Sequence, residues 1–223
     1  MGRAVMADEL LRLALCGAGD GWVVGEDGRP RVPSGLDPGL AGALLAELVI
    51  IGALRRDGEC LRAVRQGPVG DAVLDAVLAR VSRETRPRTA TWWAIRLAGD
   101  TPHVAGLAGL RRQGGVTEYE QRVRGLLRTR TVRRCFAVEN GAEEAIVRRL
   151  RAALDGERSD DRTLALLAIA HACRVDRAYF RDLSRRALKT RVREVAGDHW
   201  AAKAVAGAIN DAEVLYVAAN GSL

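Results

Sequence analysis

The longest apolar run of the chain, residues 41–54, is the feature that most constrains its fold. Its 14 residues include a single charged side chain, Glu47, for which the sequence offers no evident partner. As a helix, the run rises about 1.5 Å per residue and spans roughly 21 Å, which is short of the roughly 30 Å hydrocarbon core of a bilayer. We therefore expect residues 39–52 to form a buried helix and not a membrane span.

The segments around this run show the spacing of apolar side chains that is typical of amphipathic helices. Thr89 and Thr101 are well placed to cap two of these helices. Helices are expected over residues 7–16, 71–82, 89–98, 101 to about 114, 142–154, 162–173, 184–195 and 198–218.

Strand signals are fewer. Asp57-Gly58 lies between two short apolar stretches and predicts a hairpin over residues 53–64. A second hairpin is expected over residues 116–134, and a short strand over residues 22–24. The sequence thus predicts a mainly α fold: a single globular helical domain over residues 1–223, around a central helix bundle, with two small β-hairpins.

The residues that usually carry catalysis or metal binding form no recognisable constellation. No P-loop, nucleophile elbow or zinc-protease motif occurs, so neither an enzyme nor a metal or other cofactor is expected. Asp8 and Glu9 stand where the apolar part of a secretory signal would begin, and we expect a cytoplasmic protein. His171, on an apolar helix, is expected to be a paired core residue. Four scattered cysteines are expected to be reduced thiols: Cys16, Cys60, Cys135 and Cys173.

Positive charge is concentrated between residues 109 and 134. This stretch carries a net charge of +6, against +7 for the whole chain, because only Glu118 and Glu120 oppose its eight arginines. A charge so localised indicates a surface that meets an anionic partner. The eight are Arg111, Arg112, Arg122, Arg124, Arg128, Arg130, Arg133 and Arg134.

A three-residue loop over residues 125–127 would pair these arginines across the hairpin. Arg124 would face Arg128, and Arg122 would face Arg130, which puts all four on one side of the ribbon. Like charges directly opposite destabilise a hairpin, so this arrangement implies a bound anion or a neighbouring acid. A four-residue loop would scatter the arginines instead.

The expected loop tip carries two leucines, Leu126 and Leu127. Arginines beside an exposed apolar tip favour a membrane surface, where each basic residue contributes about 1 kcal/mol and each buried leucine roughly 1.5–3 kcal/mol. Three alternatives stay open: a winged-helix-like nucleic-acid-binding protein, a scaffold whose hairpin makes only subunit contacts, and arginines that form ordinary ion pairs. Among these, nucleic acid is disfavoured because no recognition helix with base-reading side chains is evident.

Several blocks, taken together in their order and spacing, resemble the Golgi phosphoprotein 3 family in its short actinobacterial-type form. The resemblance covers about residues 7–216. Its blocks are Asp8–Leu15, Gly42–Leu48, Gly70–Asp75, Arg86–Trp93, Arg162–Ala172 and His199–Ala201.

The resemblance implies a helical domain that binds phosphatidylinositol 4-phosphate on the cytosolic face of a membrane. It also implies a hairpin, here at residues 118–131, that inserts into the bilayer or mediates homo-oligomer contacts. Trp22 is the candidate for the family's headgroup tryptophan, whereas the positions of its headgroup arginines hold Ala41, Thr101 and Val104.

The basic segment is therefore the expected lipid site. We expect a non-catalytic adaptor, peripheral on the inner face of the membrane, that binds phosphatidylinositol 4-phosphate or another anionic phospholipid. Leu126 and Leu127 would insert into the bilayer. The expected headgroup-binding residues are Trp22, Arg111, Arg112, Arg122, Arg124, Arg128 and Arg130.

Overall fold

The computed structural model describes residues 5–65, 67–124, 129–138 and 141–220. More than half of the residues lie in helices, and the strands form two small three-stranded antiparallel sheets, which confirms the mainly α class. In chain order the elements are α1 (Met6–Cys16), β1 (Trp22–Val23), α2 (Leu36–Ile50), β2 (Leu54–Asp57), β3 (Cys60–Ala63), α3 (Ala72–Arg83), β4 (Arg88–Thr89), α4 (Ala90–Ala98), α5 (Pro102–Arg112), β5 (Val116–Arg124), β6 (Thr129–Ala137), α6 (Ala142–Leu154), α7 (Asp161–Ala172), the 3₁₀ turn η1 (Val175–Ala178), α8 (Arg185–Ala196) and α9 (Trp200–Asn220).

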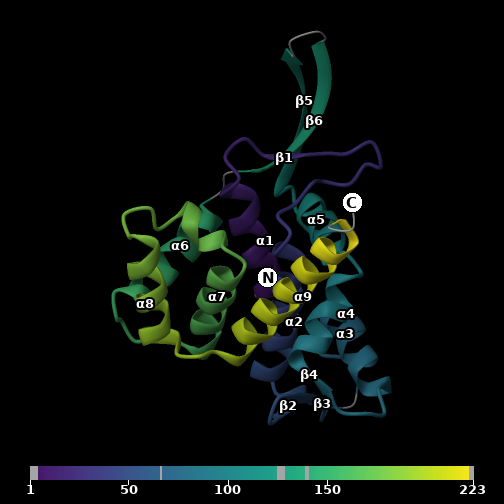
Figure 1. The fold of residues 1–223 in the computed structure, drawn as a ribbon, viewed down its shortest axis with the longest axis vertical. Coiled ribbons are helices and arrows are strands. Elements are labelled where there is room, and N and C mark those ends of the chain that lie inside the picture. Colours follow the sequence, from purple (N-terminus) through teal and green to yellow (C-terminus); the bar gives the residue numbers. More distant parts are fainter. Residues whose placement is uncertain (1–4, 66, 125–128, 139–140, 221–223) are drawn as a thin grey trace.

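Helix α2 is the centre of the fold, as its apolar sequence predicts. It packs against α1, α4, α7 and α9, and Figure 1 shows α9 crossing over it. Its two faces serve two apolar clusters: Leu40 packs with α1 and with α6–α9, whereas Leu45 packs with α3, α4 and the β2–β3 hairpin. A side chain at Gly42 would lie 2.3 Å from Val205, so glycine is what allows α9 to approach so closely.

A buried ion-pair network supplies the partner that Glu47 lacked in the sequence. The Arg162 guanidinium lies 3.0 Å from Glu47 and 2.9 Å from Glu9, and all three side chains are at most 10% exposed. Glu47 also accepts the backbone N–H of Met6 at 2.8 Å, and Arg149 reaches Glu9 from the rim at 2.7 Å. The network therefore joins α1, α2, α6 and α7.

Several helix starts are capped by a side chain, and the two caps predicted from threonines have different outcomes. Thr89 accepts the N–H of Trp92 at 3.1 Å and caps α4, as predicted. The prediction for Thr101 is wrong: this residue has a left-handed backbone, with φ of 51°, and its side chain makes no cap hydrogen bond. The carboxylate of Asp37 accepts the N–H of His103 instead, at 3.1 Å. The start of α5 is therefore capped from α2.

The two sheets lie at opposite ends of the long axis of the molecule (Figure 1). The predicted hairpin of residues 53–64 is confirmed as β2–β3, and β4 adds a third strand that the sequence did not reveal. At the other end, β5 and β6 form a long hairpin that projects from the helical body, and β1 pairs with β6. This projecting hairpin positions the candidate site.

Candidate functional site

The hairpin leaves the helical body at a tight turn after α5. Gly114 has a positive φ of 69°, which glycine adopts without strain. The N–H of Gly115 then donates to the carbonyl of Leu110 at 2.8 Å, and the N–H of Val138 donates to Gly115 at 2.9 Å. Both strands are therefore fixed to the body where they begin and end.

The base of the hairpin is further held by β1. Trp22 pairs with Cys135, which is fully buried, and Val23 pairs with Arg134. The rings of Tyr119 and Phe136 contact each other with centroids 5.9 Å apart. Because β1 covers only two residues, the outer part of the hairpin is a two-stranded ribbon.

The predicted pairing of arginines across the hairpin is wrong. Arg124 pairs with Thr129 and Arg122 with Thr131, while Arg130 lies opposite Val123. The register is shifted by one residue because four residues, not three, separate the strands. Arg130 is therefore paired with the residue next to Arg122, and the two arginines are not cross-strand neighbours on one side of the ribbon.

At the base, Glu118 holds two of the arginines. Arg111 forms an ion pair with Glu118, and Arg133 lies 3.8 Å from the same carboxylate. Arg134 has a structural role, because its guanidinium donates to the carbonyls of Asp20 at 2.9 Å and Gly21 at 3.4 Å. It ties the loop before β1 to the hairpin.

Other arginines are open to solvent. Arg112 and Arg122 are exposed and have no ion-pair partner within the described part of the chain. Arg122 is six residues from the start of β5, or roughly 20 Å along the strand. The exposed basic groups are thus spread between the base of the hairpin and its strand, and they do not form a single pocket. Arg124 and Arg130 belong to the described backbone ladder, whereas Leu126, Leu127 and Arg128 lie outside the described residues.

Trp22 does not join the exposed arginines. It is 4% exposed and lines a hollow of about 560 Å³ whose walls come from α1, the start of α2, the end of α7 and α9. Arg174, at the wall of this hollow, has a left-handed backbone with φ of 65°. Trp22 is therefore buried, whereas Arg112 and Arg122, two of the predicted headgroup arginines, are exposed.

The family model of Golgi phosphoprotein 3 (GPP34) matches residues 23–212. The chain belongs to the Golgi phosphoprotein 3 family. The match runs from β1 into α9 and includes the whole basic hairpin, in agreement with the resemblance of residues 7–216. No curated protein matches the chain.

The positions at which the resemblance implies headgroup arginines carry no charge here. Ala41 is fully buried in α2, Thr101 precedes α5, and Val104 is an exposed apolar residue of α5. Next to them lies a pair that the sequence did not reveal: Nδ1 of His103 is 2.8 Å from a carboxylate oxygen of Asp37. An acid from α2 thus lies close to where the resemblance implies cationic residues.

Burial and pairing account for two of the thiols and for the half-buried His171. Burial raises the pKa of the Cys16 and Cys173 thiols to about 12, so both are protonated at neutral pH. His171 is paired with Asp176 at 2.7 Å, as a core histidine is expected to be. Within the described ranges no three metal-binding side chains gather, and no helix is both long and apolar enough to cross a bilayer.

Proposed function

We propose that the protein is a peripheral, non-catalytic adaptor that binds anionic phospholipids through the β5–β6 hairpin. Phosphatidylinositol 4-phosphate is one candidate lipid, and another anionic phospholipid is the alternative. Family membership supports a lipid-binding type of function. The observation that carries the proposal is a basic two-stranded ribbon that projects from the helical body (Figure 1).

The charges of the ribbon support a membrane surface more than a single headgroup pocket. Arg112 and Arg122 are exposed and unpaired within the described residues, and they are spread along the strand and its base. Each such residue contributes about 1 kcal/mol at an anionic bilayer. Leu126 and Leu127 are proposed to insert, and each buried leucine adds roughly 1.5–3 kcal/mol. The sum is sufficient for reversible binding at the inner, cytosolic face of a membrane.

Vesicle flotation tests the proposal. The protein is mixed with vesicles of neutral phosphatidylcholine alone, with added phosphatidylserine, or with added phosphatidylinositol 4-phosphate. We expect binding only to the anionic vesicles, and its loss in the double variant Leu126→Asp, Leu127→Asp. We expect Arg112→Gln and Arg122→Gln to weaken binding about fivefold each, which corresponds to ~1 kcal/mol.

A matched control removes two arginines from the helical body. Arg185 and Arg186 are exposed on α8, away from the hairpin. If Arg185→Gln with Arg186→Gln weakens flotation as much as the hairpin changes do, net charge alone explains binding and the proposal fails. Circular dichroism and thermal unfolding of every variant verify that the fold is retained. Binding to phosphatidylinositol 4-phosphate well above an equally charged phosphatidylserine vesicle identifies the headgroup.

Subunit contact is a second candidate role for the hairpin. Strand β5 is an edge strand of nine residues, because the sheet order is β1-β6-β5. An open edge of this length can pair with a second copy of the chain. Mass measurement in solution, for the wild type and for a hairpin deletion, tests this role independently of lipid.

A further inference from the structure

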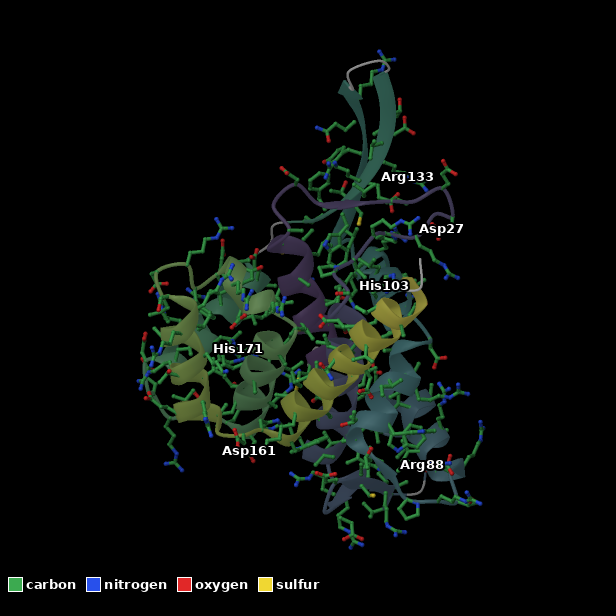
Figure 2. The ribbon with its side chains drawn as sticks, viewed as in Figure 1. Asp27, Arg88, His103, Arg133, Asp161 and His171 are labelled. Carbon is green, nitrogen blue, oxygen red and sulfur yellow. The ribbon has the colours of Figure 1, made fainter. Side chains whose placement is uncertain are left out.

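A second basic surface lies at the end of the molecule opposite the hairpin. It is built from α3, the turn after α3, the start of α4 and strand β3. Figure 2 shows Arg88 at this end and Arg133 near the base of the hairpin. Two hollows, of about 160 Å³ and 530 Å³, share Trp93 and Glu84 in their walls. We call this region the Trp93 surface.

Arginines line both hollows. The smaller is lined by Arg62 and Arg86, and the larger by Arg80, Arg83 and Arg96. Two of them are paired: Arg80 with Asp100, and Arg62 with Asp57 at 3.6 Å. The other three are exposed and have no ion-pair partner among the described residues. The region therefore carries uncompensated positive charge.

The acid shared by the two hollows does not cancel this charge. Glu84 accepts the backbone N–H of Arg86 at 3.2 Å and lies 3.5 Å from the guanidinium of Arg88. That guanidinium stacks over the ring of Trp92, 4.7 Å from its centroid. Glu84 and Arg88 thus neutralise each other, and the remaining arginines stay available to an anionic partner.

Trp93 supplies an independent sign that an acceptor is missing. Its side chain is 2% exposed, and its indole N–H has no hydrogen-bond acceptor within the described residues. A buried tryptophan N–H normally finds a partner, because leaving it without one costs free energy. Trp93 also lies in the walls of both arginine-lined hollows.

We propose that the Trp93 surface binds an acidic peptide segment of a soluble protein. Separate hollows lined by different arginines fit successive carboxylates of an extended peptide better than one small anion. Ile95, 41% exposed, and Trp92 add apolar contact beside the charges. The choice of a soluble partner rests on the proposed membrane contact of the hairpin, because opposite ends of the molecule cannot face one bilayer. The binding of the acidic peptide itself does not depend on membrane contact by the hairpin.

Fluorescence anisotropy with a labelled octa-glutamate peptide tests the proposal at low ionic strength, where exposed charges are least screened. We expect Arg83→Glu with Arg86→Glu to weaken binding at least about tenfold, as loss of charge complementarity at an interface does. The matched control, Arg185→Glu with Arg186→Glu on α8, changes the net charge equally and is expected to bind as the wild type does. Arg96→Gln provides a second, milder variant should the first fail to fold.

Flotation separates this proposal from the lipid-binding function. The Arg83→Glu, Arg86→Glu protein should float with anionic vesicles as the wild type does, and the Leu126→Asp, Leu127→Asp protein should bind the peptide normally. The proposal is overturned if the wild type does not bind octa-glutamate. Equal weakening by the α8 control, or tighter binding of a single-stranded oligonucleotide than of the peptide, also overturns it.

Discussion

Arginine has opposite roles in the helical core and in the hairpin. In the core, Arg162 is 3% exposed and lies between two glutamates on α1 and α2. On the hairpin and at its base, Arg122 and Arg112 are exposed and have no partner within the described residues. Removal from water makes each core charge dependent on its partner, whereas a hydrated surface charge remains available to a ligand. Burial, and not residue type, separates the arginine of the buried ion-pair network from the arginines that are open to solvent.

Arg134 lies between these extremes. It belongs to the basic segment by sequence, yet its guanidinium is used to hold the carbonyls of Asp20 and Gly21. The comparison therefore predicts a graded response of stability as an arginine is removed from the core, from the hairpin base or from the exposed surface.

The largest effect is expected in the core. Arg162→Met leaves Glu9 and Glu47 buried without their shared cation, and we expect a loss of about 3–5 kcal/mol in the free energy of unfolding. Urea denaturation followed by circular dichroism measures this loss. Adding Glu47→Gln should recover much of it, because the uncompensated charge of Glu47 is then absent while Glu9 keeps its ion pair with Arg149. A loss below about 1 kcal/mol for the single change would remove the contrast between the two regions.

A smaller effect is expected at the hairpin base. Arg134→Ala removes hydrogen bonds from a charged donor to two carbonyls, and such bonds contribute about 1.5–3 kcal/mol. The neighbouring Arg133→Ala, whose side chain is 48% exposed, is the control and should cost at most about 0.5 kcal/mol. Hydrogen exchange reports the local effect, since the N–H of Val24 donates to Arg133 across β1 and β6 at 2.8 Å. Unchanged protection at Val24 in Arg134→Ala would contradict the anchoring role.

Local patterns were sufficient to predict the helices and most of their starts. The apolar run of α2 predicted a central buried helix, and Thr89 predicted a cap that the structure confirms. Strands β1 and β4 have two residues each, which is too short to show a period of two, and only pairing with distant segments defines β4 as a strand.

The long-range contacts of the candidate site and of the core could not be predicted from the sequence. The hairpin was located correctly, but its register depends on a loop length that one residue changes, and the predicted arginine pairs were wrong. Glu47 and Arg162 are 115 positions apart, and Asp37 and His103 are 66 apart. Neither pair leaves a local signal, because no periodicity or turn motif links such distant positions. The roles of the exposed arginines and of Leu126 and Leu127 remain predictions.

The smallest effect is expected from a titrating group at the edge of the core. Burial, and next the nearby Arg56, lower the pKa of His199 below its usual value, while Asp161 opposes the shift. Nδ1 of His199 accepts the N–H of Ala201 at 3.3 Å, which requires the neutral ring. Because the unfolded chain takes up this proton more readily, the contribution of His199 to stability is present above about pH 6.5 and is lost as the pH falls below it. Urea denaturation at both sides of this value should show a weaker pH dependence for His199→Gln than for the wild type. Equal pH dependence would mean that His199 takes up its proton as readily in the folded protein as in the unfolded chain, and would contradict this prediction.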